Sequence, residues 1–201
     1  MLKIGITGGI GSGKTTVCKI FETLGIPVFY ADTSAKEIMV TDVDLVNGIK
    51  NTFGEDSYGI DGILNNKYLA DLVFNNPVEL EKLNALVHPA VFRGFDRWLS
   101  NISANVPYIL KEAALLFESG SYKNCDYSIL VTAPFQTKLN RVMKRDGVNE
   151  EQVRIRMDKQ LNDEEKAKLA NFFIRNEETQ SIVLQVYDLH KQYLKISNDL
   201  K

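Results

Sequence analysis

The sequence predicts an α/β protein that folds as a three-layer sandwich, with a parallel sheet of five strands between layers of helices. Short apolar segments rich in β-branched residues alternate along the chain with longer segments of helical periodicity, which favours a parallel sheet. A glycine-rich turn joins the first apolar segment directly to the first helical segment. A helical block over residues 33–103 is too long for a simple crossover between two strands, so it predicts an inserted helical region.

The expected strands and helices follow the chain in order. Apolar runs predict strands at residues 2–7, 26–30, 106–110, 127–131 and 172–174. Apolar residues at helical spacing predict helices at residues 16–24, 33–40, 43–53, 67–74, 78–99, 135–145, 150–160, 163–170 and 178–196. Pro89 interrupts the longest pattern, so a kink or a break is expected after His88. Asn149 and Asn162 each stand three residues before a Gln or Glu, which is the spacing of a helix N-cap pair.

Residues 8–15 read GGIGSGKT and fit the pattern G-x-x-x-x-G-K-[ST] of a phosphate-binding loop. Glycines let the backbone curl with its N–H groups pointing inward, Lys14 supplies a mobile positive charge, and the Thr15 hydroxyl can bind Mg²⁺. The following helix directs the positive end of its dipole at the phosphates. Strand, loop and helix occur in the order that the motif requires, so we interpret the segment as an ATP or GTP site in a fold of the P-loop nucleoside-triphosphate hydrolase type, not as a turn without a ligand. The loop residues expected to bind the nucleotide are Gly9, Ile10, Gly11, Ser12, Gly13, Lys14, Thr15 and Thr16.

Composition and charge narrow the class of protein. The 201-residue chain carries 24 Lys and Arg against 26 Asp and Glu, a net charge of −2, which argues against broad electrostatic binding of nucleic acid. Cys18 and Cys125 are expected to be reduced thiols. The first strand leaves no room for a signal peptide, and no apolar run approaches the ~20 residues that span a membrane. We expect a cytoplasmic protein without nucleic-acid or membrane partners, as a monomer or weak homo-oligomer.

Asp32 follows the second predicted strand, at the end where open parallel sheets collect their ligands. A carboxylate there can accept or orient the proton of an attacking hydroxyl during phosphoryl transfer. Asp32 also precedes a helical run, so it can equally be a helix N-cap. Glu112 follows the third predicted strand, where it can hold Mg²⁺ through water or serve as a surface or capping carboxylate. His88 has no metal-ligand spacing with His190, and a lone histidine is more often structural than catalytic.

A basic cluster lies in the segment that follows the fourth predicted strand. Its members are Lys138, Arg141, Lys144, Arg145, Arg154, Arg156 and Lys159. Arg141 and Arg145 are four residues apart and share a helical face, and Asp146-Gly147 separates two basic halves. The arrangement suits a lid that closes over ATP and presents guanidinium groups to the transferred phosphoryl group. A solvated pair of surface helices is the alternative interpretation.

The loop alone does not decide the class of nucleotide-binding protein. The guanine-reading segment N/T-K-x-D of a GTPase is missing, since Asn66-Lys67 lacks the following Asp, and the Ser-Gly-Gly-Gln signature of transporter ATPases is also missing. A helical insert, a strand-end Asp and an Arg-rich lid in a small chain are the layout of a small-molecule kinase. A nucleotide-dependent switch module is the alternative from another class, and it predicts nucleotide binding without an acceptor that speeds turnover.

Several segments together resemble the dephospho-coenzyme A kinase family, in the same order and over nearly the whole chain. The matching segments are Ile6–Thr15, Tyr30–Asp32, Leu83–Pro89, Leu115–Gly120, Arg141–Gly147, Gln160, Ala170 and Ile174–Asn176. The chain departs from the family's usual residues at Ala114, Lys138, Asn171 and Glu177. These departures lie near the lid and the adenine end, so they bear on nucleotide contacts and not on the reaction.

The resemblance implies ATP-dependent phosphorylation of the 3′-hydroxyl of dephospho-coenzyme A, which gives coenzyme A and ADP in the last step of coenzyme A synthesis, with Mg²⁺ as cofactor. It implies one kinase domain over residues 1–201, with a five-stranded parallel sheet. The expected core spans about residues 1–32 and 104–201, the substrate-binding insert about 33–103, and the lid about 136–160.

The expected roles of the site residues follow from this reaction. Asp32 takes or orients the proton of the 3′-hydroxyl, while Lys14 and the lid residues Arg141 and Arg145 neutralise charge on the moving phosphoryl group. Thr15 is the expected ligand of Mg²⁺. The remaining expectations are that His88 and Leu116 help to hold the acceptor and that Asn176 lies near the adenine.

Overall fold

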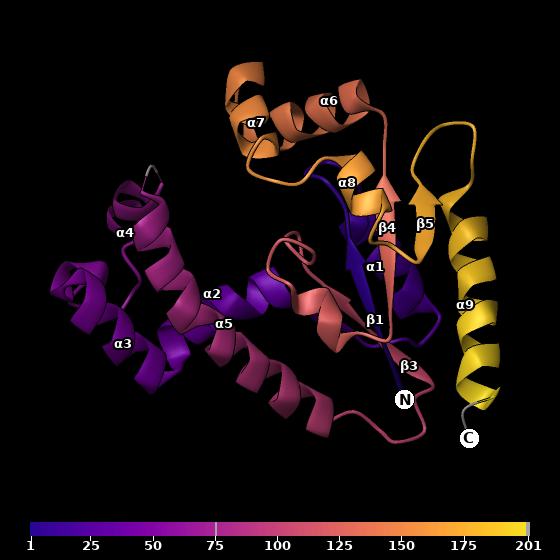
Figure 1. Ribbon diagram of the computed structural model, residues 1–201, viewed down its shortest axis with the longest axis horizontal. Helices are drawn as coiled ribbons and strands as arrows, with labels where there is room; N and C mark the ends of the chain where they lie inside the picture. Colours follow the sequence, from indigo (N-terminus) through magenta and orange to yellow (C-terminus); the bar gives the residue numbers. More distant parts are fainter. Residues whose placement is uncertain (75, 200–201) are drawn as a thin grey trace. The chain divides into compact units, whose positions relative to one another are not determined.

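The computed structural model describes residues 1–74 and 76–199 (Figure 1). Within them, five strands form one sheet in the order β2-β3-β1-β4-β5, and every neighbouring pair is parallel. The strands are β1 (Leu2–Thr7), β2 (Val28–Tyr30), β3 (Tyr108–Glu112), β4 (Tyr127–Thr132) and β5 (Phe172–Arg175). The predicted α/β fold with a five-stranded parallel sheet is confirmed, and the carboxyl ends of all these strands share one edge of the sheet.

Strand β3 occupies different residues from those predicted. It begins at Tyr108, two residues later than expected, and it includes Lys111 and Glu112; all of its residues are buried. Pro107, which was predicted to be inside the strand, has no N–H for a sheet hydrogen bond and precedes it. The prediction failed because a Lys-Glu pair looks like the end of a strand, whereas the position of β3 between β1 and β2 buries it completely.

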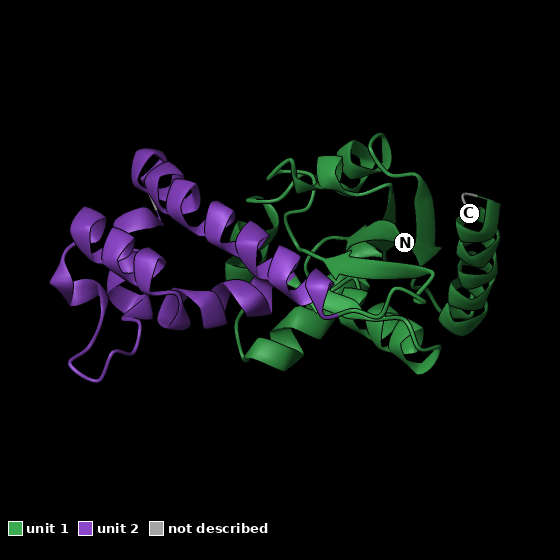
Figure 2. Cartoon of the chain, turned by 90° about the horizontal axis from the view of Figure 1, so that it is seen from below, with its two compact units in different colours: residues 1–30, 102–201 green, residues 31–101 purple. Residues whose placement is uncertain are grey.

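The chain divides into two compact units, which Figure 2 colours separately. Unit 1 comprises Met1–Tyr30 and the chain from Ile102 onward, and unit 2 comprises Ala31–Asn101. Unit 1 holds the sheet and the helices α1 (Lys14–Thr23), α6 (Phe135–Asp146), α7 (Glu150–Met157), α8 (Asp163–Ala167) and α9 (Ile182–Asp199), with a 3₁₀ turn at Ser121–Asn124. Helices α1 and α9 pack on each other and on the sheet, and their apolar faces form the main core with strands β1, β3 and β4.

Local sequence signals set the starts of helices α7 and α8. The Asn149 Oδ1 atom accepts a hydrogen bond from the Gln152 N–H at 2.9 Å. The Asn162 Oδ1 atom accepts one from the Glu165 N–H at 2.8 Å. In both cases the side chain of the second residue returns a bond to the first, so both predicted N-cap pairs are confirmed as capping boxes.

Three helices are shorter than predicted, among them α8, which ends at Ala167 rather than at residue 170. Helix α7 ends at Met157 rather than residue 160, and α9 begins at Ile182 rather than residue 178. After β5 the chain makes a turn in which the Gln180 N–H donates to the carbonyl oxygen of the preceding Glu177 at 3.2 Å. The polar residues around this turn looked helical because helix propensity alone cannot distinguish the first turn of a helix from the loop before it.

Unit 2 is helical and has its own apolar core. Its helices are α2 (Ala31–Thr41), α3 (Val43–Phe53), α4 (Asn66–Val73) and α5 (Pro77–Ser100), with a 3₁₀ turn at Glu55–Ser57. The core includes Ile38, Leu45, Ile49 and Leu69. The buried Tyr58 and the half-buried Tyr68 reinforce it, since their hydroxyls donate to the carbonyls of residues 39 and 53 at 2.6 and 2.8 Å.

Helix α5 runs without a break through Pro89, so of the kink or break predicted after His88, the break is wrong. A proline inside a helix removes one backbone hydrogen bond and clashes with the preceding turn, at a cost of about 3 kcal/mol. Packing of α5 on α2, α3 and α4 offsets this cost: Ala90, directly after the proline, is fully buried. Gly94 also lets α5 approach α2 closely, because a Cβ atom there would lie 2.5 Å from the Ile38 side chain.

The described helices and the two cysteines allow two further predictions to be checked, on membrane spans and on disulfides. None of the helices in the described part of the chain combines the length and the apolar character needed to cross a lipid bilayer. Cys18 and Cys125 are both free thiols, as predicted. Burial raises the pKa of the Cys125 thiol to about 11. Cys18 lies on the inward face of α1 and is fully buried in the core. Both thiols are therefore protonated and unreactive at neutral pH.

An aromatic cluster joins α9 to β3 in unit 1. The Tyr108 hydroxyl and the Nδ1 atom of His190 are 2.6 Å apart and share a hydrogen bond. The ring of Tyr193 packs against Tyr108, with 5.2 Å between ring centroids. Burial lowers the pKa of His190, because the charged imidazolium would lose its hydration there.

This lowered pKa predicts a pH-dependent stability. Between the pKa of folded His190 and the ordinary value of about 6.5, the unfolded chain binds more protons than the folded chain. The free energy of unfolding should therefore fall as the pH drops below about 6.5, by at most about 1.4 kcal/mol per pH unit for this one proton. Urea unfolding followed by circular dichroism at pH 7, 6 and 5 measures the slope. The slope should flatten in His190→Gln, and an equal slope in both proteins would assign the pH dependence to other groups.

Candidate functional site

The phosphate loop lies between β1 and α1, and its backbone needs glycine. Gly11 and Gly13 have positive φ angles of 81° and 95°, which residues with a Cβ atom rarely adopt. A Cβ atom on Gly11 would lie 2.5 Å from the carbonyl oxygen of Lys138, and one on Gly13 would lie 2.2 Å from the amide nitrogen of Asn176. Glycine is thus required here for its backbone angles and for the space that neighbouring groups occupy.

Lys14 and the start of α1 supply positive potential to the loop. The helix begins at Lys14, and its first N–H groups have no carbonyl partner inside the helix. The Lys14 ammonium donates to the carbonyl oxygen of Gly8 at 2.9 Å, so it folds back over the loop. Thr15 and Thr16 lie exposed in the first turn. The hydroxyl of Ser12 is buried and has no hydrogen-bond partner among the described residues. Together these groups form a concave surface suited to an anion.

Asn176 and Arg141 hold one side of the loop from outside. Asn176 follows β5, and its buried side-chain amide donates to the carbonyl oxygen of Ser12 at 2.8 Å. The Oδ1 atom of Asn176 accepts from Arg141 of α6 at 3.3 Å. Arg141 also donates to the carbonyl oxygen of Gly11 at 3.4 Å. Asn176 was predicted to lie near the adenine, and its observed contacts are with the backbone of the loop.

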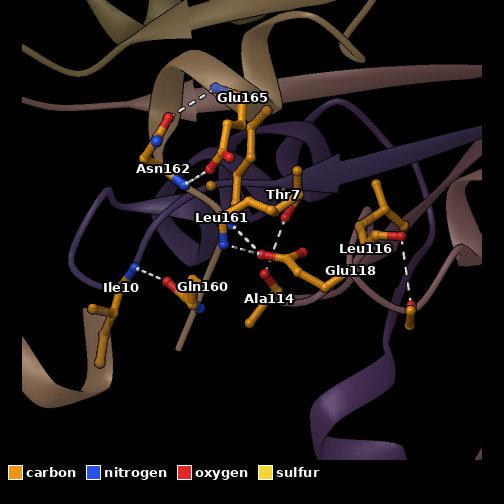
Figure 3. A network of polar contacts seen from close by, with 12 residues as sticks. Thr7, Ile10, Ala114, Leu116, Glu118, Gln160, Leu161, Asn162 and Glu165 are labelled. Carbon is orange, nitrogen blue, oxygen red and sulfur yellow. Dashed lines mark hydrogen bonds and ion pairs between the residues drawn. The ribbon is translucent and has the colours of Figure 1, made fainter. Parts of the chain in front are cut away.

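The other side of the loop meets the segment between α7 and α8. The Ile10 N–H donates to the side-chain oxygen of Gln160 at 2.9 Å (Figure 3). Nearby, the Lys138 ammonium forms an ion pair with Asp163 at 2.6 Å, and both side chains lie close to Gly9. A cavity of about 700 Å³ opens at this place and is lined by Gly9, Ile10, Lys138, Gln160 and Asp163 among others. The loop is therefore adjacent to a space large enough for a small-molecule ligand.

The predicted basic cluster does not act as one unit. Arg145 forms a two-point ion pair with Asp146 at 2.6 and 3.0 Å, and Arg156 contacts the same carboxylate at 2.7 Å. These guanidinium groups hold the pKa of Asp146 well below its usual range. Arg154 pairs with Glu150 on the surface of α7. The structure thus brings Arg141 to the loop and places the other arginines in exposed ion pairs, as in the surface-helix interpretation.

Other predicted site residues lie on both units. Asp32 is exposed in the first turn of α2, at the second helical position and not at the N-cap, two residues after β2 ends. Glu112 is the last residue of β3 and not a loop residue, and it is buried beside β1, where it is in register with Ile6. His88 is half-buried in α5 of unit 2. Leu116 is fully buried, with its side chain packed against Gly5 of β1.

The residues that depart from the family's pattern all have partners inside unit 1. The Ala114 carbonyl accepts from the Thr7 hydroxyl at 3.3 Å, and the ammonium of Lys138 pairs with Asp163. The Asn171 side-chain oxygen accepts from the N–H of residue 128 at 2.9 Å. Glu177 accepts from the side chain of residue 180 at 2.9 Å. The side chains of Lys138, Asn171 and Glu177 are therefore each held by a hydrogen bond or ion pair within unit 1, while the Ala114 contact uses only its backbone carbonyl.

Three residues near the loop were missed or left without a role by the sequence analysis. Gln160 appeared only as part of a pattern, and Glu118 and Lys166 were given no role. Lys166 is fully buried and forms an ion pair with Glu118 at 3.1 Å. Its helix, Asp163–Ala167, is so rich in charged residues that every position looks exposed, and no local signal marks the buried one.

Comparison with known proteins shows which family this chain matches. The family model of dephospho-CoA kinase matches residues 2–181. The dephospho-CoA kinase of Salinibacter ruber is 42% identical over 180 residues, which are 89% of this chain and 90% of that protein. The crystal structure of TT1252 from Thermus thermophilus aligns with a TM-score of 0.84 at 34% identity, over 95% of this chain and 96% of that one. The dephospho-CoA kinase structure from Campylobacter jejuni aligns with a TM-score of 0.70 at 26% identity, over 96% and 97% of the two chains.

The space beside Gly13 gives a direct test of the loop. Gly13→Ala should raise the dissociation constant of ADP by about tenfold or more, since the new Cβ atom would displace the Asn176 amide from the loop. Gly25→Ala is the matched control, because Gly25 also has a positive φ, of 78°, but no atom in the described part of the chain lies within 4 Å of its added Cβ. Both substitutions should lower the free energy of unfolding by about 1–2 kcal/mol. Calorimetric titration with ADP distinguishes them, and equal ADP affinities would mean that Asn176 does not shape the loop.

Proposed function

The chain belongs to the dephospho-CoA kinase family, and on this basis we propose how its own residues carry out the reaction. The activity is the ATP-dependent phosphorylation of dephospho-CoA, the final step of coenzyme A synthesis. The observation that supports the residue assignments most strongly is the wound phosphate loop, held in place by Asn176, Arg141 and Gln160. Phosphoryl transfer depends mainly on positioning and charge stabilisation, and a preformed loop supplies both.

We assign the β- and γ-phosphates of ATP to the loop from Gly9 to Thr16. Inward N–H groups and the start of α1 would hold the phosphate oxygens. Lys14, which bonds to the Gly8 carbonyl at 2.9 Å, would exchange that bond for the phosphates. Arg141 lies beside the loop and would stabilise negative charge as the phosphoryl group moves. Arg145 would have to leave Asp146 to contribute, so we rank it below Arg141 and assign it to the proposed lid over residues 136–160.

The residues around the loop fit a magnesium ion. The described residues contain no group of three His, Cys, Asp or Glu side chains suited to a metal. Magnesium in kinases instead binds one or two protein oxygens, water and the substrate phosphates. The exposed Thr15 hydroxyl and, through water, the carboxylate of Glu112 would supply those oxygens. When bound, the ion would neutralise charge on the phosphates.

We propose that Asp32 is the general base. Its carboxylate would take the proton from the 3′-hydroxyl of dephospho-CoA, while a bond forms from that oxygen to the γ-phosphorus and the bond from the γ-phosphorus to the bridging oxygen of ADP breaks. The exposed position of Asp32 at the start of α2, just after β2, leaves the carboxylate accessible to an acceptor. Unit 2 would hold the acceptor, with His88 of α5 among the contacting residues. The buried Leu116 packs against Gly5 of β1, so it would help the acceptor site only indirectly, through the packing of the chain after β3.

The reaction is tested by the release of ADP from Mg-ATP with dephospho-CoA, adenosine or AMP as the acceptor. Strong stimulation by dephospho-CoA alone is expected. Stimulation by another acceptor would keep the kinase chemistry and replace the substrate. ATP binding without stimulation by any of the three would favour a nucleotide-dependent switch module.

Lys14→Ala should reduce kcat by about 10²–10³-fold, since it removes the positive charge that follows the phosphates. Lys19→Ala is the matched control, because Lys19 is an exposed residue of the same helix, one turn further on. Circular dichroism should show folded protein in both cases. Turnover by Lys14→Ala at the rate of Lys19→Ala would refute the assignment of the loop.

Asp32→Asn should reduce kcat by about 10²–10⁴-fold and leave the ADP affinity nearly unchanged, because an amide cannot take the proton of the hydroxyl. Asp71→Asn, an exposed carboxylate of α4 in the same unit, is the control. Steady-state kinetics and thermal unfolding are measured together. A drop in melting temperature at unchanged kcat would identify Asp32 as a structural carboxylate.

A further inference from the structure

The last residue of the proposed lid, Gln160, and the next residue, Leu161, make contacts in opposite directions. The side-chain oxygen of Gln160 accepts from the Ile10 N–H of the phosphate loop at 2.9 Å. The next residue, Leu161, donates its N–H to the carboxylate of Glu118 at 3.0 Å. Figure 3 shows both bonds side by side. The segment is therefore fixed to the loop on one side and to the chain after β3 on the other.

Glu118 is itself held by a buried charge. The ammonium of Lys166 is fully buried and lies 3.1 Å from Glu118 Oε1, the same oxygen that accepts from Leu161. Among the described residues, neither this ammonium nor the second oxygen of Glu118 has a hydrogen-bond partner. This ion pair is costly to separate, because the fully buried ammonium of Lys166 would be left without water and without a counter-charge, although 17% of the Glu118 side chain is exposed. Glu118 is therefore an anchor of nearly fixed position.

The segment that carries Glu118 and the helix that carries Lys166 are also fixed. Ala114, four residues before Glu118, accepts from the Thr7 hydroxyl at the end of β1. At the start of α8, Asp163 pairs with Lys138 of α6 at 2.6 Å. The backbone of Lys138 in turn lies against Gly11 in the loop. These contacts connect both segments to β1 and α6, which lie next to the phosphate loop.

We propose that Gln160 is a positioning residue for the phosphate loop and that the ion pair of Glu118 and Lys166 sets its place. Without this acceptor the Ile10 N–H would need water or another partner, and the turn of the loop could rotate. Gln160 fixes that N–H and so keeps the loop in the form that binds phosphate. Because Gln160 ends the proposed lid, its bond to Ile10 couples a movement of the lid to the conformation of the loop, beside the bond from Arg141 to Gly11.

The first test compares Gln160→Met with Gln192→Met, which changes an exposed glutamine of α9. Gln160→Met keeps the length of the side chain and removes the acceptor. It should make the Ile10 amide exchange with solvent about tenfold faster in NMR spectra and raise the ADP dissociation constant and the KM for ATP by a similar factor. The melting temperature should match that of Gln192→Met. Unchanged Ile10 exchange and ADP affinity would overturn the proposal.

A conservative variant separates positioning from packing. Gln160→Glu keeps an accepting oxygen, so Ile10 should stay protected from exchange as in the unmodified chain. Its added negative charge would itself weaken ADP binding, so only the exchange rate is compared for this variant. Loss of protection in Gln160→Glu equal to that in Gln160→Met would contradict a role for the accepting oxygen.

The anchor is tested with Glu118→Gln, Lys166→Met and the double variant. Glu118→Gln leaves a buried ammonium without a counter-charge, and it should increase the exchange rate at Ile10 and lower the melting temperature. The double variant removes both charges while residue 118 can still accept from Leu161, so it should recover both quantities. If Glu118→Gln lowers the melting temperature and leaves Ile10 exchange unchanged, the pair stabilises the fold without setting Gln160.

This inference rests on the assignment of the loop to phosphates. The tests distinguish a failure of the proposed kinase function from a failure of the proposed role of Gln160. A chain that binds ADP without phosphorylating dephospho-CoA would contradict the function, while Ile10 exchange in Gln160→Met would still decide the role of Gln160. Lys14→Ala should greatly reduce turnover and leave Ile10 exchange as it is, since Lys14 bonds to Gly8 and not to Ile10.

Discussion

The site depends on a backbone that must stay wound while its N–H groups face an anion. The Ser12 N–H donates to the Gly9 carbonyl inside the loop at 3.0 Å, but N–H groups used in this way cannot bind phosphate, so the shape of the loop is held largely from outside. Asn176 supplies a donor to the Ser12 carbonyl, Arg141 supplies one to the Gly11 carbonyl, and Gln160 accepts from the Ile10 N–H. These groups come from the chain after β5, from α6 and from the segment before α8, so segments far apart in the sequence hold a loop of a few residues.

Charge at the site is local. The chain has a net charge of −2, and several arginines near the loop are neutralised by Asp146 or Glu150. The cationic groups that donate to the loop backbone are the ammonium of Lys14 and the guanidinium of Arg141, and the start of α1 adds the positive end of a helix. A polyphosphate would thus be selected by the fit of a few directed donors and not by a broad positive field, which agrees with the absence of a basic surface signal in the composition.

Features that depend on neighbouring residues could be predicted from the sequence. The phosphate loop, the two capping boxes and the order of strands and helices follow from motifs a few residues long, and all of them are confirmed. Features that depend on distant residues could not. The extension of β3 through Lys111 and Glu112 depends on its two neighbouring strands, and the continuity of α5 through Pro89 depends on the packing of unit 2. The contact of Gln160 with Ile10 joins residues 150 positions apart, and no local pattern can show it.

We infer that the loop is already in its phosphate-binding form before the nucleotide binds. Crystal structures of the chain with and without Mg-ADP would test this most directly. We expect the backbone of residues 8–15 to differ by less than about 1 Å between the two structures. The hydrogen bonds from Asn176 to Ser12 and from Ile10 to Gln160 should be present in both. A loop that is disordered or differently wound without nucleotide would contradict it, and would mean that the phosphates themselves shape the loop.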